Sequence, residues 1–208
     1  MNRRRALIAL LGSAGLMGSF RHLSAQASAA IGKPAPAFKV PDTEGRIKQL
    51  SDFAGKPVVL EWTSPSCPFV RAQYQSGVMQ ELQNLATKQS AVWLTVLSTH
   101  PSRRDYLPPE KAMAFQRGRR AASSALLMDA EGTLGKAYGA VVTPHIFIVG
   151  ADGKLVYAGA TGDKSTTQAD EVRTSRSFIR EALADLAAGR KVATPTSRPF
   201  GCTIAYRG

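Results

Sequence analysis

The chain of 208 residues contains 27 lysines and arginines against 15 aspartates and glutamates, a formal net charge of +12 at pH 7. This length suits one domain with a sizeable core, and two cysteines are too few for a disulfide-rich scaffold. The densest basic cluster is Arg117, Arg119 and Arg120, without the interleaved aromatic residues of a nucleic-acid-binding stripe. We therefore expect these arginines to be solvated, and we expect no nucleic-acid partner.

Residues 1–27 have the pattern of an export signal peptide. Arg3-Arg4-Arg5 precede an uncharged stretch from Ala6 to Phe20, and Ala25-Gln26-Ala27 has the small residues of a cleavage site. The uncharged stretch is shorter than the roughly 20 residues that a membrane span needs. We expect a periplasmic protein, exported by the Sec or twin-arginine route, with no stable membrane insertion after signal removal. An uncleaved interfacial anchor is the alternative.

The first half of the mature chain alternates between strand and helix patterns. Ser51-Asp52 can begin a brief helical turn. In chain order, the other predicted elements are two short strands within 35–50 around a polar turn, a strand at 58–62, one long helix at 68–88, a buried strand at 91–98 and a helix at 110–121.

The second half continues with a strand at 124–129 and a short helix at 132–139 that ends at a glycine. A hairpin follows at 145–150 and 154–159, with Asp152-Gly153 in its turn, and a last helix at 170–188. Strands separated by helices, then a hairpin and a helix, predict an α/β fold. Its mixed sheet would have helices on both faces.

Cys67 lies where the strand 58–62 ends and the long helix begins. Free backbone N–H groups and the positive end of the helix dipole favour a thiolate there, and a thiolate is the nucleophilic form. Pro68 suits the first helical position, where no N–H is needed. We expect the reduced protein to react with iodoacetamide at Cys67, whereas a merely structural cysteine would be inert.

The order of elements, the position of Cys67 and the stretch AYGAVVTPHIFIVGADGKLVYAG together resemble the thioredoxin superfamily. The nearest likeness is its exported redoxin branch, which links thioredoxin-like reductases to peroxiredoxins of the AhpC/TSA type. The resemblance covers residues 32–190, implies a three-layer fold and leaves 191–208 as a tail. It also implies a cis Thr143-Pro144 step beside Cys67, with Pro68 and Phe69 completing a substrate-binding surface. From sequence alone, Pro144 is only a common way to begin a strand.

The resemblance also bears on the positions of Val70 and Glu61. In Cys67-Pro68-Phe69-Val70 the second cysteine of the family's Cys-x-x-Cys pattern is replaced by valine. Glu61 falls where thioredoxins hold a buried acid, which implies a role in proton transfer. A carboxylate in an apolar strand needs a partner or a raised pKa. The alternative is a glutamate that only reaches the sheet edge.

The comparison with peroxiredoxins is mixed. Ser64 matches the Thr or Ser that these enzymes carry three residues before their cysteine, whereas Leu60 replaces a proline. Their active-site arginine corresponds to Pro144-His145, and Arg71 on the helix is a possible substitute. The missing arginine weakens a peroxidase interpretation.

Cys202 lies in a tail, RPFGCTIAY, that is similar to tails in this redoxin branch. The resemblance implies that it resolves a mixed disulfide formed on Cys67. A permanent staple is a second possibility, because closing a loop of about 135 residues would stabilise the fold by roughly 4–5 kcal/mol. Two unpaired thiols are the third.

These residues predict an exported thiol–disulfide oxidoreductase that acts on thiols and disulfides of proteins or small molecules. A thiol peroxidase and a non-catalytic binding protein with a structural Cys67–Cys202 bridge are the alternatives. We expect no cofactor and no metal, because Cys67 and His145 alone make a weak ligand set and Thr63 stands where related metallochaperones have a cysteine.

Overall fold

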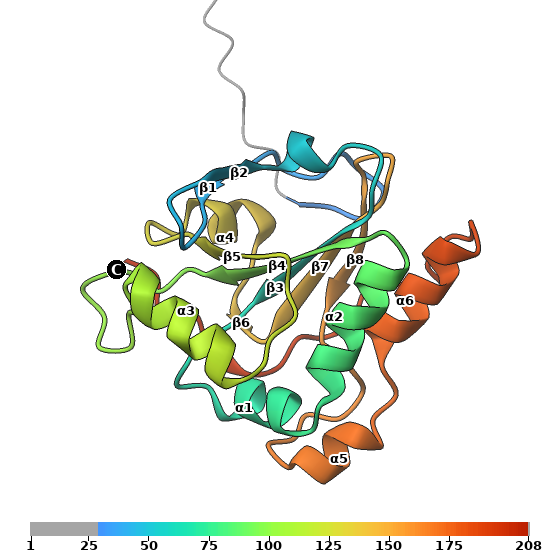
Figure 1. Ribbon diagram of the computed structural model, residues 1–208. Coiled ribbons are helices and arrows are strands. Elements are labelled where there is room, and N and C mark those ends of the chain that lie inside the picture. Colours follow the sequence, from blue (N-terminus) through green and yellow to red (C-terminus); the bar gives the residue numbers. More distant parts are fainter. Residues whose placement is uncertain (1–28, 208) are drawn as a thin grey trace, which may run out of the picture.

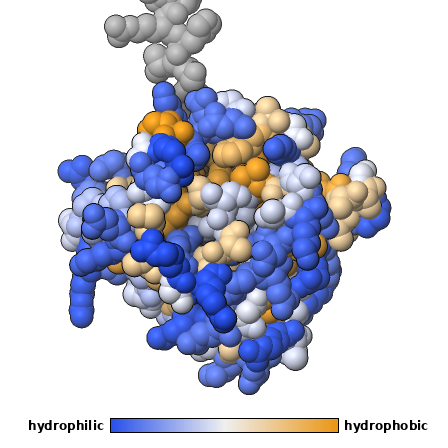
Figure 2. Space-filling view, viewed as in Figure 1, coloured by the Kyte–Doolittle hydropathy of each residue, from blue (hydrophilic) through white to orange (hydrophobic). Residues whose placement is uncertain are grey.

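The computed structural model describes residues 29–207 (Figure 1). The predicted signal peptide therefore lies outside the described residues. Among residues 29–207, no helix is both long and apolar enough to cross a membrane. The visible face of the molecule is largely hydrophilic, with smaller groups of hydrophobic residues between the charged ones (Figure 2).

A five-stranded sheet forms the centre of the molecule, in the order β5-β4-β3-β7-β8. Its strands are β3 (Val58–Trp62), β4 (Val92–Leu97), β5 (Ala125–Met128), β7 (His145–Val149) and β8 (Leu155–Gly159). β3 runs parallel to β4, and β4 parallel to β5, whereas β7 is antiparallel to both β3 and β8. The predicted mixed sheet and its late hairpin are confirmed.

Each face of the sheet carries its own hydrophobic core, because side chains alternate along a strand. On β3, Leu60 and Trp62 enter one core together with Leu134 of α4 (Thr133–Tyr138). Val59 enters the opposite core together with Leu82 of α2 (Val78–Lys88). Figure 1 shows α4 on one side of the sheet and α2 and α6 (Phe178–Ala187) on the other. The α/β architecture with helices on both faces is thus confirmed.

The smaller elements lie at the edges of this frame. β1 (Lys39–Pro41) and β2 (Ile47–Gln49) form the short antiparallel pair expected from the sequence, followed by the single turn η1 (Leu50–Phe53). α3 (Pro109–Gly118) packs against β5, where Ala112 joins a third small cluster with Leu126.

The single helix predicted at 68–88 is wrong. The chain forms α1 (Pro68–Gln75) and α2 (Val78–Lys88), and Gly77 between them has φ of 84°. Only glycine adopts this left-handed conformation at little cost. The Ser76 hydroxyl donates to the Gln73 carbonyl and accepts from the Val78 N–H, so side-chain bonds replace the helical ones at the break.

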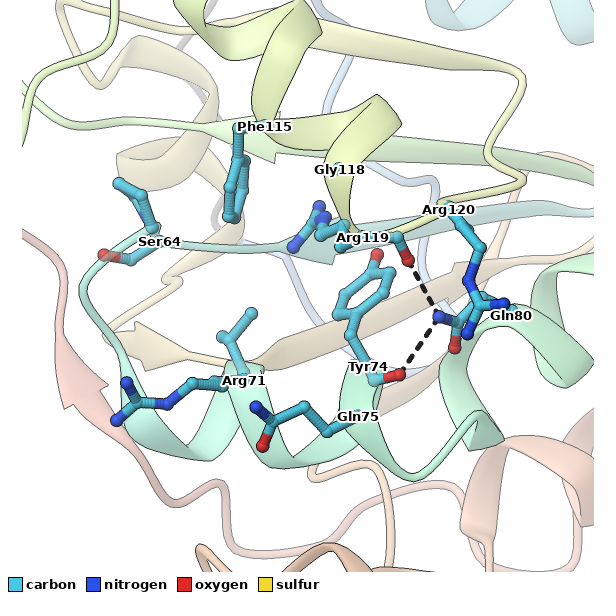
Figure 3. A pocket seen from close by; sticks show the side chains of 11 residues that line it. Ser64, Arg71, Tyr74, Gln75, Gln80, Phe115, Gly118, Arg119 and Arg120 are labelled. Carbon is cyan, nitrogen blue, oxygen red and sulfur yellow. Dashed lines mark hydrogen bonds between the residues drawn. The ribbon is translucent and has the colours of Figure 1, made fainter.

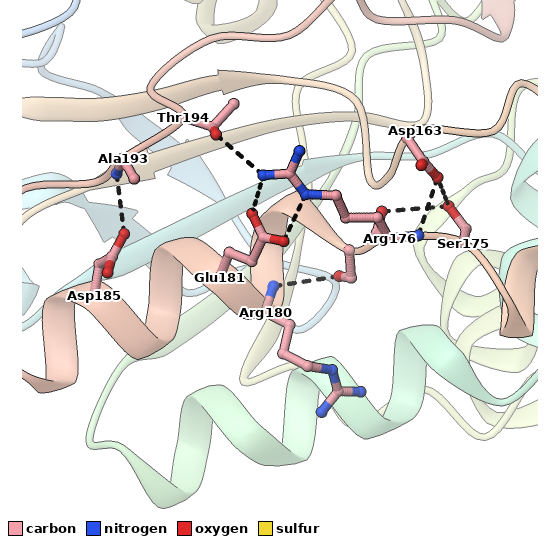
Figure 4. A network of polar contacts seen from close by, with 9 residues as sticks. Asp163, Ser175, Arg176, Arg180, Glu181, Asp185, Ala193 and Thr194 are labelled. Atoms are coloured by element: carbon pink, nitrogen blue, oxygen red, sulfur yellow. Dashed lines mark hydrogen bonds and ion pairs between the residues drawn. The ribbon is translucent and has the colours of Figure 1, made fainter.

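The helix predicted at 170–188 is also two helices, α5 (Ala169–Arg173) and α6 (Phe178–Ala187). Ser177 caps α6 by accepting from the Arg180 N–H. Before this cap, Asp163 accepts from the Ser175 hydroxyl and the Arg176 N–H, and Arg176 pairs with Glu181 (Figure 4). Serine and aspartate side chains thus satisfy the backbone where a continuous helix would have done so.

The tail returns to the sheet as β9 (Cys202–Thr203), which pairs antiparallel with β6 (Val142–Thr143). Beyond it, the Ile204 N–H donates to the Val141 carbonyl. The Tyr206 ring fills a space over Gly132 and Gly135, where a Cβ atom would overlap it, and its hydroxyl donates to the Ala140 carbonyl at 2.9 Å. The sequence indicated that the tail carries a partner for Cys67, but it predicted neither the pairing of β9 with β6 nor the packing of Tyr206.

Candidate active site

Cys67 is the N-cap residue of α1, with an extended backbone, and Pro68 opens the helix. Its side chain is buried, with 1% exposure, and its thiol donates to the Thr143 carbonyl at 3.0 Å. The Thr143-Pro144 peptide bond is cis, as the resemblance implied. The end of β3, the start of α1 and the step before β7 therefore meet at this one sulfur atom.

Cys202 lies directly opposite Thr143 in the β6–β9 pair, and both cysteines are thiols. Burial, and then a hydrogen bond and the charge of the adjacent Cys67, raise the pKa of Cys202 to about 12, although the Phe69 N–H acts in the opposite direction. The structure thus brings together two cysteines that are far apart in sequence. Cys202 therefore keeps its proton as long as Cys67 is not part of a disulfide.

Close packing holds the tail against the active-site loop. Gly201 has φ of 142°, and a Cβ atom there would overlap the Thr143 carbonyl, so the tail approaches this loop through a glycine. Phe200 packs on Phe69 with 5.9 Å between ring centroids. Phe69, predicted as part of a substrate-binding surface, is therefore partly covered by the chain's own tail.

Glu61 is completely buried on β3, on the face covered by α1 and α2. The Tyr74 hydroxyl donates to its Oε1 at 2.9 Å, and the Trp93 indole donates to its Oε2 at 2.8 Å. Gln83 and Thr95 donate to Oε2 as well. Burial raises the pKa of Glu61, and the charge of Arg119 partly opposes this rise. The predicted buried acid is present, but its hydrogen bonds among residues 29–207 do not include Cys67.

Ser64 forms its side-chain hydrogen bonds within residues 29–207 to Ser66 and Asp105, not to Cys67. Its hydroxyl is 3.2 Å from that of Ser66, and both serines donate to a carboxylate oxygen of Asp105. The Ser66 bond is the shorter, at 2.9 Å. Asp105 lies in a loop, and the sequence held no spacing that linked it to this turn.

The arginine cluster is not uniformly solvated, contrary to our expectation. The Arg119 guanidinium stacks on the ring of Tyr74 at 3.7 Å and on that of Phe115 at 4.2 Å. Beside it lies an open cavity of about 450 Å³ between the turn at Ser64, α1 and the end of α3 (Figure 3). Arg71 lines this cavity, and its side chain is exposed.

His145 packs on Phe147, with 4.4 Å between ring centroids, and Phe147 belongs to the core on the face opposite that of Cys67. Burial lowers the pKa of His145 to about 4, so the ring is neutral at physiological pH. In the described part of the chain, no three histidine, cysteine, aspartate or glutamate side chains gather as metal ligands would.

Comparison with known proteins relates this chain to a family of known proteins. A model of the AhpC/TSA family matches residues 31–158. Over 165 residues the chain is 24% identical to the thiol-disulfide oxidoreductase ResA of Bacillus cereus, across 79% of this chain and 89% of that protein.

Two solved structures show the same fold. A hypothetical protein from Sinorhizobium meliloti 1021 superposes with a TM-score of 0.73 at 22% identity, over 87% of this chain and 97% of the other. The peroxidoxin BcpB from Mycobacterium tuberculosis gives a TM-score of 0.55 at 22% identity, over 78% and 99% of the two chains. Because the family match extends over more than half of the sequence, the chain belongs to the AhpC/TSA family, in the redoxin branch of the thioredoxin superfamily.

Proposed function

We propose that this protein is a thiol–disulfide oxidoreductase in which Cys67 is the nucleophile and Cys202 the resolving thiol. The observation that carries the proposal is the position of Cys202 opposite Thr143, whose carbonyl accepts from the Cys67 thiol. A second thiol in this position supports the role of resolving cysteine, which the Cys-x-x-Cys pattern assigns to the position that Val70 occupies here. The name of the Bacillus cereus relative, a thiol-disulfide oxidoreductase, supports the same chemistry.

The reaction proceeds in two exchanges. The Cys67 thiolate attacks one sulfur of a substrate disulfide, a bond forms between Cys67 and that sulfur, and the other half leaves as a thiolate. Cys202 then loses its proton and attacks the Cys67 sulfur. The second half of the substrate leaves as a thiol, and the Cys67–Cys202 disulfide remains. The substrate has gained two electrons, and an external thiol reductant returns them to the protein.

The raised pKa of Cys202 gives these steps an order. Burial is the largest cause of this rise and persists throughout, followed by the hydrogen bond with Cys67 and the charge of Cys67. The last two disappear when Cys67 enters a mixed disulfide. Cys202 then deprotonates more readily, at the step where a second nucleophile is needed. Resolution is therefore coupled to the first exchange.

The surrounding residues have supporting roles in this proposal. Thr143 and Pro144 hold the backbone against which a substrate disulfide is presented, and Pro68 and Phe69 form the opposite wall. Glu61 assists proton transfer indirectly, through its hydrogen bond with Tyr74 of α1, and does not contact the Cys67 sulfur. Ser64 positions the preceding turn through Asp105.

The test uses the reduced protein and bis(2-hydroxyethyl) disulfide, followed by mass spectrometry of the intact chain. Wild-type protein should become internally oxidised, whereas Cys202→Ser should accumulate a mixed disulfide on Cys67. Cys67→Ser should not react at an appreciable rate. Thr203→Ser, an exposed neighbour in β9, is the matched control and should behave as the wild type. Equal reaction of Cys67→Ser and wild type would refute the assignment of the nucleophile.

A thiol peroxidase is the second candidate, favoured by the AhpC/TSA family match. There, Cys67 attacks peroxide, forms a sulfenic acid and releases water, and Cys202 condenses with the sulfenic acid. A fixed positive donor for the developing charge is worth roughly 3–4 kcal/mol in such sites. In stopped-flow experiments, we expect peroxide to oxidise Cys67 at the rate of an ordinary thiolate. A rate orders of magnitude above that of free cysteine would make the protein a peroxidase.

A permanent bridge is the third possibility, and its reduction potential distinguishes it. Structural disulfides lie below about −300 mV, whereas catalytic ones are less negative. Equilibration of the Cys67–Cys202 pair against glutathione and dithiothreitol buffers measures this value. We expect a potential above that limit.

We also propose export to the periplasm, on the pattern in residues 1–27. Expression of the full chain, cell fractionation and N-terminal sequencing should yield a periplasmic protein that begins near residue 28. A cytoplasmic protein with its initial residues intact would contradict this proposal.

A further inference from the structure

The cavity of about 450 Å³ shares its walls with the segments that carry Cys67. Ser64 and Pro65 belong to the turn before Cys67, and Val70 and Arg71 belong to the first turns of α1. The far wall comes from the end of α3 (Figure 3). The volume lies in the range of small-molecule binding sites, roughly 300–1,000 Å³. A ligand in this cavity would lie against the helix that begins at the proposed nucleophile.

The charged side chains that line the cavity are all positive. Arg71, Arg119 and Arg120 line it, and no acidic residue does. Within residues 29–207, none of these three side chains forms an ion pair with a carboxylate. By contrast, the arginines that do form such pairs elsewhere are Arg46, Arg173, Arg176, Arg180, Arg190 and Arg207. A concave surface lined by unpaired cations concentrates anions.

Arg119 is held rigidly beside this cavity. Its Nη1 donates to Thr63 and its Nε to Gln116, and two aromatic rings pack on its faces. Gln80 fixes the backbone by donating to the carbonyls of Tyr74 and Arg119, as Figure 3 shows. The Arg119 Nη2 atom is buried without a hydrogen-bond partner. The other two arginines, Arg71 and Arg120, line the cavity and are exposed to solvent.

The walls also include apolar surface. Phe115, Val70 and Tyr74 line the cavity together with the arginines. An anion held only by cations would need no such surface, whereas an organic anion uses both. Guanidinium groups recognise carboxylates through paired hydrogen bonds.

We propose that this cavity, which adjoins the turn before Cys67 although Cys67 itself does not line it, binds the carboxylate-bearing part of a small disulfide substrate during its reaction with Cys67. The inference rests on the proposed function for its chemistry, and it specifies the class of substrate. Arg117 also lies in the last turn of α3 and is exposed, but it does not line the cavity. An effect of general positive charge would include Arg117, whereas binding in the cavity would not. Arg117 therefore provides the matched control.

The experiment compares two aromatic disulfides with the reduced protein. One is 5,5′-dithiobis(2-nitrobenzoate), with a carboxylate on each half, and the other is the uncharged 4,4′-dithiodipyridine. Each rate constant is divided by that of N-acetylcysteine amide with the same reagent, which removes intrinsic reactivity. Arg71→Gln/Arg120→Gln should lower the normalised rate of the carboxylate reagent about tenfold and leave that of dithiodipyridine within twofold.

The control Arg117→Gln should change neither rate by more than twofold. If Arg117→Gln lowered the rate of the carboxylate reagent as much as Arg71→Gln or Arg120→Gln alone, the preference would be due to general positive charge. That result would overturn the proposal. Both replaced arginines of the cavity are exposed, so thermal unfolding should show an intact fold.

A second measurement does not depend on thiol chemistry. Titration of 4-nitrobenzoate into the Cys67→Ser variant should shift the backbone amide resonances of residues 64, 71 and 118–120 in a saturable way. The shifts should be lost in Cys67→Ser combined with Arg71→Gln/Arg120→Gln. Failure of both disulfides to react with wild-type protein would refute the proposed function alone. Absent or non-saturable shifts would refute the cavity as a carboxylate site, whatever the reactivity of Cys67.

Discussion

Glu61 is a carboxyl group enclosed by donors and sealed from water. Four side chains donate to it, from Tyr74, Gln83, Trp93 and Thr95. Nevertheless, the loss of hydration is the largest influence and raises its pKa above the ordinary value of 4.5. The folded state therefore holds this proton more tightly than the unfolded state does. The stability that the neutral form contributes is fully present below about pH 4.5 and is lost as pH rises through the folded pKa.

This direction of the pH dependence can be tested with Glu61→Gln, because a glutamine at this position does not titrate. The difference in unfolding free energy, wild type minus variant, should fall as pH rises above 4.5, by at most about 1.4 kcal/mol per pH unit. Urea unfolding of both proteins between pH 4.5 and 8 measures it. His145 titrates with the opposite sign, since its stabilising neutral form is lost as pH falls from 6.5 towards about 4. It is present in both proteins and cancels. A difference that grows with pH would show that Arg119 and the four donors outweigh desolvation.

At the scale of elements, both predicted long helices are interrupted. Gly77 adopts a left-handed conformation between α1 and α2, and Ser177 caps α6 after a hydrogen-bonded turn. Because of the first break, α1, whose N-cap is Cys67, runs in a different direction from α2 (Figure 1). The position of the thiol and the packing of α2 on the sheet are therefore set by separate short helices.

Gly77→Ala should destabilise the protein by about 1–2 kcal/mol, because an alanine at φ of 84° crowds its own backbone. Gly118→Ala is the matched control. Neither added Cβ atom has a neighbour within 4 Å, and Gly118 belongs to a helix with no positive φ. Gly118→Ala should therefore stabilise by about 0.4–1 kcal/mol. Chemical denaturation measures both changes. Equal effects at the two sites would show that the break at Gly77 is not imposed by backbone conformation.

The sequence could predict most of the frame, because hydrophobic periodicity encodes which strands are buried. The strand of β3, the hairpin of β7 and β8 and the cysteine at the start of α1 all follow from local pattern. The helix breaks escaped prediction because Ser76 and Ser177 act through bonds to backbone groups, which leave the apolar spacing unchanged. The stacking of Arg119 on Tyr74 joins the end of α3 to α1, and no local spacing records this contact between segments far apart in the sequence. The same holds for the docking of Tyr206.

At the scale of the whole molecule, a Cys67–Cys202 bond would close a ring that contains four of the five strands of the sheet, β4, β5, β7 and β8. Because the two thiols already lie together in the folded protein, closing the ring requires little rearrangement of the sheet. Its main effect falls on the unfolded chain, which loses freedom when residues so far apart are linked.

We therefore expect the oxidised protein to be more stable than the reduced protein by up to about 5 kcal/mol, the loop-entropy contribution for a ring of this size. Thermal and urea unfolding under oxidising and reducing conditions give the comparison. Cys202→Ser should show no dependence on redox conditions. An oxidised form no more stable than the reduced one would mean that the bond distorts the active-site loop.

The docking of the tail also sets an order of events during biosynthesis. The chain is made from its N-terminus, so every strand of the central sheet and all of α6 precede Cys202 and Tyr206. A nascent chain can thus assemble its sheet while Cys67 has no partner thiol. Only when Tyr206 settles over Gly132 and Gly135 does β9 cover the site. Between these two moments Cys67 has no neighbouring thiol from its own chain.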